Sequence, residues 1–236
     1  MVRLRHIATV LIALAMVAAV SRSQTSPGVD VRVRLAIAKN SARRTAPPSV
    51  LWLVPVQKTS PAPFPPGQTY TLMQKKRTFK PHLLVIPVGS VVRFPNADPF
   101  YHNVFSLFDG KRFDLGLYEA GSSKSVTFSR EGVSYIFCNI HPEMSAVVIA
   151  LSTNIYAIGD SRGSFHSADV PPGDYDMHVW IEGVAQPALN RMTHRIHLTS
   201  SSGDLGTIDV PADQLNSKAH ANMYGQPYDR DVKPTY

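Results

Sequence analysis

Short apolar runs, broken by turns rich in proline and glycine, recur along most of the chain. In the run from Val29 to Ile37, apolar and polar residues alternate at a period of two, which is the pattern of a half-buried strand. Residues 146–151 include no polar side chain and predict a strand that is buried on both faces. No stretch of convincing length has the period of a helix. The sequence therefore predicts an all-β fold.

The first 23 residues have the pattern of a signal peptide. A basic head is followed by an apolar run, Ile7 to Val20, that is too short to span a bilayer comfortably. We expect export to the periplasm with cleavage near residues 21–23; retention of the segment as an anchor is the alternative. Cleavage would remove three arginines and no acid, so the formal net charge would fall from +7 to +4. This balance disfavours nucleic-acid binding and weakly favours an acidic partner.

Cys138 is the only cysteine in 236 residues. In an oxidising compartment a single thiol cannot form an internal disulfide, so it is reactive, intermolecular or occupied. It directly follows the apolar run 135–137, and His141 and Met144 come three and six residues later. A thiolate, an imidazole and a thioether suit copper that cycles between Cu(I) and Cu(II), provided that a second imidazole is nearby. His102 is the candidate, because a sandwich would bring the ends of two strands to one pole. Each residue alone is most simply part of a core, but together they predict a copper site.

Residues 79–151 carry short motifs in a fixed order. They are Phe79-x-Pro81, Val88-Gly89-x-x-Val92-x-Phe94-x-Asn96, His102-Asn103-Val104, Gly121 with Val126-Thr127-Phe128, and Tyr135-x-Phe137-Cys138-x-x-His141. This stretch resembles cupredoxins of the plastocyanin and amicyanin type, and its Cys-x2-His-x2-Met spacing is similar to that of amicyanin. The resemblance implies a Greek-key β-sandwich that holds one type 1 (blue) copper ion through His102, Cys138, His141 and axial Met144. It also implies that Asn103 braces the two ligand loops.

The sequence pattern changes after residue 153, where two further motifs occur: D-x-x-G-x-F from Asp160 and P-P-G-x-Y-x-x-x-V-W from Pro171. These motifs resemble a carboxypeptidase-regulatory-like, or transthyretin-like, β-sandwich, which implies a structural module without a cofactor. The combined layout is similar to that of methylamine-utilisation-like proteins. We expect a signal peptide (1–23), N-terminal strands and a proline-rich loop (28–68) that could belong to the second sandwich, a cupredoxin domain (69–152), the second sandwich (153–211) and a tail (212–236).

Several alternatives at the expected site stay open. Glu143 could replace Met144 as the axial ligand, and His82 could be an extra ligand or a redox-tuning group, although a packed or surface histidine is simpler. Residues 75–77, Lys-Lys-Arg, are most simply a solvated turn rather than a docking patch. A second metal site can be imagined from a further set of acidic and histidine side chains, which exposed strand faces explain more simply: Asp174, Asp176, His178, His194 and His197.

The expected function is one-electron transfer between periplasmic redox partners such as a c-type cytochrome or a dehydrogenase. His141 would be the exit route for the electron, with Ile140, Pro142 and Pro99 forming an apolar rim. An enzyme is not expected, because all four coordination positions would be protein atoms and the sequence has no His-Glu-x-x-His motif or nucleophile elbow. The alternatives are copper binding for delivery or storage, and a metal-free envelope scaffold.

Overall fold

The computed structural model describes residues 28–37, 45–57, 65, 67–107, 110–211 and 215. The expected signal peptide lies outside these residues, as does the expected C-terminal tail apart from Leu215. In the part of the chain that is described, no helix is both long enough and apolar enough to cross a membrane.

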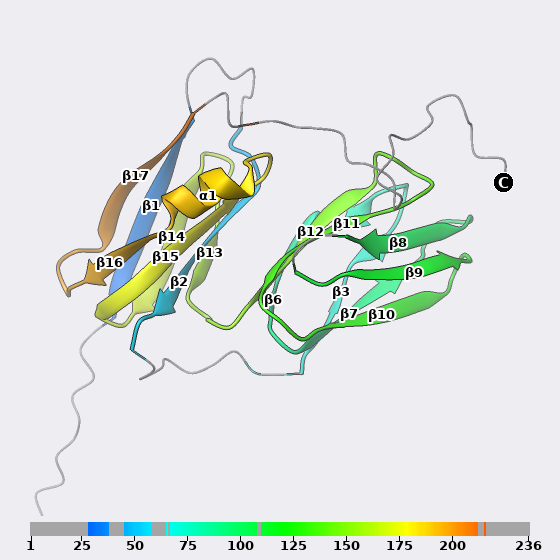
Figure 1. Cartoon of the computed structure of the whole chain (residues 1–236), viewed down its shortest axis with the longest axis horizontal. Helices are drawn as coiled ribbons and strands as arrows, with labels where there is room; N and C mark the ends of the chain where they lie inside the picture. Colours follow the sequence, from blue (N-terminus) through cyan, green and yellow to red (C-terminus); the bar gives the residue numbers. More distant parts are fainter. Residues whose placement is uncertain are drawn as a thin grey trace, which may run out of the picture.

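The described chain is built from β-strands with one short helix, so the expected all-β fold is confirmed (Figure 1). The elements are β1 (Val29–Ile37), β2 (Ser49–Pro55), β3 (Thr69–Thr71), β4 (Met73–Gln74), β5 (Phe79–Lys80), β6 (Leu83–Pro87), β7 (Ser90–Pro95), β8 (His102–Ser106), β9 (Phe113–Tyr118), β10 (Ser123–Phe128), β11 (Gly132–Phe137), β12 (Ser145–Leu151), β13 (Tyr156–Ile158), β14 (Ser164–Val170), β15 (Gly173–Ile181), α1 (Gln186–Met192), β16 (His194–Leu198) and β17 (Asp204–Val210).

The middle of the chain forms one β-sandwich, called here the central sandwich. A five-stranded sheet in the order β6-β12-β11-β8-β9 packs on a three-stranded sheet in the order β10-β7-β3. Inward side chains of both sheets, such as Phe94, Phe128 and Ile136, are almost fully buried between them. Strands β8 and β11 are antiparallel, and Phe137 at the end of β11 pairs with Phe105, so the start of β8 lies beside the loop that follows β11.

A second β-sandwich, called here the flanking sandwich, combines strands from before and after the central one. Its sheets have the orders β14-β1-β17 and β13-β2-β15-β16. In β1, each valine from Val29 to Val33 is buried while the residues between them are exposed, as the alternation predicted. Because β1 pairs with β14 and β17, and β2 with β13 and β15, the central sandwich is inserted between β2 and β13.

Strand β12 belongs to both hydrophobic cores. Ala146 and Val148 point into the central sandwich, whereas Val147 and Ile149 pack with residues of the flanking sandwich. Its predicted burial on both faces is therefore confirmed, with all residues from Ala146 to Leu151 at most 4% exposed. Polar contacts cross the same interface as well: Trp180 Nε1 donates to the Tyr135 hydroxyl (3.1 Å), and His82 Nε2 lies 2.6 Å from Glu182 Oε1.

The helix α1 is too short to be found from a helical period in the sequence. This helix has only seven residues, with a proline in its first turn, and it buries Ala188 and Leu189. Two turns are too few to display a helical period, so tertiary packing rather than sequence pattern stabilises it.

Candidate metal centre

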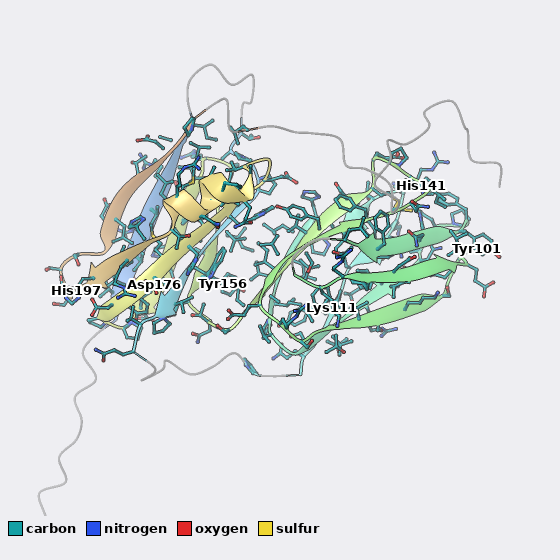
Figure 2. All side chains as sticks on the ribbon, viewed as in Figure 1. Tyr101, Lys111, His141, Tyr156, Asp176 and His197 are labelled. Atoms are coloured by element: carbon teal, nitrogen blue, oxygen red, sulfur yellow. The ribbon has the colours of Figure 1, made fainter. Side chains whose placement is uncertain are left out.

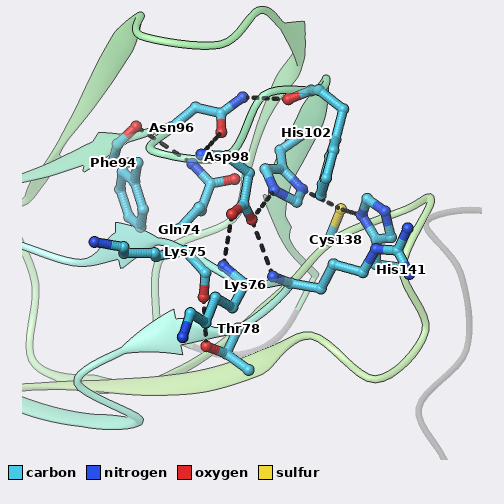
Figure 3. Close-up of polar contacts among 12 residues, drawn as sticks. Gln74, Lys75, Lys76, Thr78, Phe94, Asn96, Asp98, His102, Cys138 and His141 are labelled. Atoms are coloured by element: carbon cyan, nitrogen blue, oxygen red, sulfur yellow. Dashed lines mark hydrogen bonds and ion pairs between the residues drawn. The ribbon is translucent and has the colours of Figure 1, made fainter. Parts of the chain in front are cut away.

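Two chain segments bring three potential metal ligands together at one pole of the central sandwich. His102 is the first residue of β8, Cys138 directly follows β11, and His141 lies in the loop between β11 and β12. Cys138 Sγ is 3.8 Å from His102 Nδ1 and 3.5 Å from His141 Nδ1 (Figure 3). The three ligand atoms lie within 4.8 Å of one another, and among the described residues this is the group of histidine, cysteine and acidic side chains suited to hold a metal ion.

The three side chains are closed to solvent, with exposed fractions of 0% for His102 and Cys138 and 2% for His141. Burial lowers the pKa of both histidines, that of His141 to about 4, so each imidazole is neutral at physiological pH and has a lone pair to offer. Burial raises the pKa of the Cys138 thiol, an effect that backbone amides of the ligand loops partly oppose. One soft sulfur with two imidazole nitrogens is a donor set that fits copper.

Met144 is positioned by the same loop. Its side chain is fully buried in the same apolar cluster as Cys138. Its amide donates to the His141 carbonyl (3.0 Å), and its carbonyl accepts from the Cys138 amide (3.4 Å), so the loop closes on itself. Glu143, the alternative axial ligand, is exposed. This difference in burial favours Met144 over Glu143.

Asn103 links the two segments that carry the ligands. Its Oδ1 accepts from the amide of Asn139 (3.2 Å), next to Cys138, and its Nδ2 donates to Asp114 Oδ1 on β9 (2.7 Å). The contact from β8 to the loop after β11 is the bracing arrangement that the sequence resemblance implied.

Asp98 is a part of the site that sequence reasoning missed. Its Oδ2 accepts from His102 Nε2 (2.9 Å), and the carboxylate is only 6% exposed. This bond holds the proton on Nε2 and turns Nδ1 toward Cys138. The amides of Lys76 (2.6 Å) and Arg77 (2.9 Å) donate to the same carboxylate, and the hydrogen bonds together keep the pKa of Asp98 below its usual value although burial would raise it. Figure 3 shows Lys76, Asp98 and His102 in this chain of contacts.

Phe100 lies over the site. Its ring centroid is 5.3 Å from that of His102 and 5.6 Å from that of His141. His141, expected as the exit route for an electron, is itself nearly covered, whereas Pro99, Tyr101 and Pro142 are exposed nearby in the sequence. In Figure 2, His141 and Tyr101 lie at the end of the central sandwich that is far from the flanking sandwich.

The other candidate ligands are engaged elsewhere. His82 bonds to Glu182 and, through Nδ1, lies 3.1 Å from the Ser145 carbonyl, so it belongs to the contact between the sandwiches. The imagined second metal site is not assembled: Asp174 pairs with His197, Asp176 pairs with Arg195, and the ring of His178 stacks on Trp52. His194 bonds to a backbone carbonyl.

No protein-family model and no curated protein matches the chain. Part of the chain is similar to solved structures. A purple cupredoxin from Nitrosopumilus maritimus is 26% identical over 35% of this chain and 99% of that one, with a TM-score of 0.32. An amicyanin from Paracoccus versutus is 24% identical over 39% and 94%, with a TM-score of 0.33. The copper-containing nitrite reductase NirK from Thermus scotoductus is 26% identical over 42% of this chain and 25% of that one, with a TM-score of 0.34.

Proposed function

We propose that this chain is an exported, periplasmic type 1 copper protein that carries single electrons between redox partners. The observation that supports the proposal most directly is the buried convergence of His102, Cys138 and His141 on one point. Met144, buried in the same cluster as Cys138, would complete the proposed ligand set through its thioether. Copper held there would alternate between Cu(I) and Cu(II), accepting and releasing one electron.

The surrounding residues favour a carrier over an enzyme. The two imidazoles and the thiol are fixed by packing and by Asp98 and Asn103, so the ligands need little rearrangement between oxidation states. All four side chains are buried, which favours a closed ligand set over a coordination position that is open to a substrate. The same burial opposes ready release of the ion, which disfavours the alternative of copper delivery.

The partner is proposed to be another redox protein, such as a c-type cytochrome or a periplasmic dehydrogenase. The exposed residues near the site, Pro99, Tyr101 and Pro142, would form the apolar part of a small interface of the kind that weak redox encounters use. The flanking sandwich is proposed to be structural, of the carboxypeptidase-regulatory-like type.

The test is to load the protein without residues 1–23 with one equivalent of copper and to record absorption and paramagnetic resonance spectra. We expect an intense visible thiolate-to-copper band that a mild reductant bleaches reversibly. Cys138→Ser and His102→Gln should abolish this band. His166→Gln, which changes an exposed histidine of the flanking sandwich, is the matched control and should leave the band unchanged.

Two results would contradict the carrier. Binding of Cu(I) alone, with ready transfer to a chelator, would indicate copper delivery. Failure to retain copper, with equal stability of the parent and Cys138→Ser proteins, would indicate a metal-free scaffold.

A further inference from the structure

A basic turn lies at the metal pole of the central sandwich. Strands β4 and β5 form a hairpin whose ends are joined by residues 75–78, with hydrogen bonds from Lys75 N to Thr78 O (3.0 Å) and from Thr78 N to Lys75 O (3.3 Å). The two central residues, Lys76 and Arg77, have φ values of +56° and +53°. A two-residue hairpin turn with this backbone normally contains Asn-Gly, because most other side chains are strained in the left-handed region.

The carboxylate of Asp98 offsets this strain and fixes the turn to the site. It accepts the amides of both central residues, and its Oδ2 also accepts from the ring of His102. The turn is therefore held against a metal-ligand candidate by a buried anion, while the side chains from Lys75 to Thr78 are exposed.

Arg77 contacts the aromatic ring that packs on both imidazoles. Its guanidinium carbon lies 5.3 Å from the centroid of the Phe100 ring, and that ring packs on both His102 and His141. Lys80 adds a further exposed cation on β5. Glu143 on the ligand loop and Glu119 after β9 are exposed acids at this pole, and Asp98 is turned inward. The four exposed cations of the hairpin, Lys75, Lys76, Arg77 and Lys80, outnumber these two exposed glutamates.

Resting on the proposed function, we propose that the turn formed by residues 75–78 is the docking element for a redox protein whose own electron-transfer site is surrounded by carboxylates. Opposite charges raise the rate of encounter, and the turn would guide the partner onto Phe100, one ring away from both imidazoles. Asn-Gly would be less strained than Lys-Arg at this turn. Binding of a partner by the two cations would account for the strained residues.

The test measures electron transfer from the reduced copper protein by stopped flow. The probes are two c-type cytochromes of opposite surface charge, one acidic and one basic. The variants are Lys76→Glu and, as a milder change, Lys75→Gln. Arg112→Glu is the matched control, because Arg112 is exposed next to the end of β9 that pairs with Ser106, roughly 14 Å along the strands from His102.

With the acidic cytochrome, Lys76→Glu should lower the second-order rate constant about tenfold at low ionic strength, and Lys75→Gln should lower it less. Added salt should remove these differences, and the basic cytochrome should react faster with Lys76→Glu than with the parent. Arg112→Glu should change each rate much less. Equal effects of Lys76→Glu and Arg112→Glu, or no effect of either, would overturn the docking proposal. The visible band would still bleach reversibly in that case, which separates failure of the docking proposal from failure of the proposed function.

Discussion

Asp98 places a negative charge in contact with His102 in a region that excludes water. A buried charge acts on its neighbours more strongly than a solvated one, because the effective dielectric constant is lower. The carboxylate should therefore stabilise the more positive of two oxidation states at the proposed site, which is Cu(II).

We expect Asp98→Asn to raise the reduction potential by about 60 mV or more, the shift that corresponds to a tenfold change in a one-electron equilibrium. Asparagine keeps a carbonyl oxygen for His102 or for the turn but removes the charge. A spectroelectrochemical titration gives the potential, and Glu119→Gln, an exposed change on the same sandwich, is the control. An unchanged potential would leave Asp98 with only a structural role.

For single residues, the sequence predicted the candidate metal ligands but not the side chains that contact them. The sequence predicted one site for Cys138, His141 and His102. The evidence was the single cysteine, the spacing of the ligand loop and the expectation that two strand ends meet at one pole of a sandwich. Asp98 and Phe100 carry no such signal. They stand in a loop of ordinary composition, and their importance comes from contacts with a turn more than twenty residues earlier in the chain.

The short hairpin of β4 and β5 has a strained backbone in its turn and is also the proposed docking element. Each strand has two residues, and the turn between them holds two side chains in the left-handed region. Lys-Arg is not a turn signal of this type, so the sequence predicted a solvated turn and could not predict its backbone or its place beside the site.

Replacing the turn with its preferred residues, as Lys76→Asn with Arg77→Gly, should raise the free energy of unfolding by about 1 kcal/mol, because the strain is relieved. Denaturant titration followed by circular dichroism measures this change. The same protein should react more slowly with the acidic cytochrome. A loss of stability instead would mean that the side chains of Lys76 and Arg77 contribute more than their backbone strain costs. Lys75→Asn, outside the two strained positions, is the control.

At the scale of the molecule, the described parts of the two sandwiches share an apolar wall, and His82 and Glu182 form an ionisable contact between them. The hydrogen bond with Glu182 raises the pKa of His82 and outweighs the opposing effect of burial. A histidine whose pKa is raised on folding contributes stability below its unfolded value, near pH 6.5, and this contribution disappears as the pH rises through the folded value.

Glu182→Gln should therefore lower the unfolding temperature at about pH 5.5 and have little effect at about pH 9. The pair is partly exposed, so we expect a difference of no more than about 4 °C. Both tryptophans, Trp52 and Trp180, belong to the flanking sandwich, so fluorescence reports its unfolding directly. Asp174→Asn, which breaks an exposed pair within one sheet, is the control. A difference that grows with pH would contradict the assigned role of His82.

Residues 146–151 show how far sequence could predict this arrangement. Their unbroken apolar character indicated a strand with two covered faces, and that prediction is confirmed. The sequence could not predict that the flanking sandwich covers the second face of this strand, because apolar strands of either sandwich could have packed there.

The insertion of residues 56–155 between β2 and β13 has a consequence for the order of folding. During synthesis, β1 and β2 leave the ribosome first, and about a hundred residues must follow before the strands with which they pair are available. The interrupting unit, in contrast, has all its own strands in one continuous stretch. We expect it to fold first and to bring the ends of β2 and β13 together, which reduces the entropy that closing so long a loop would otherwise require.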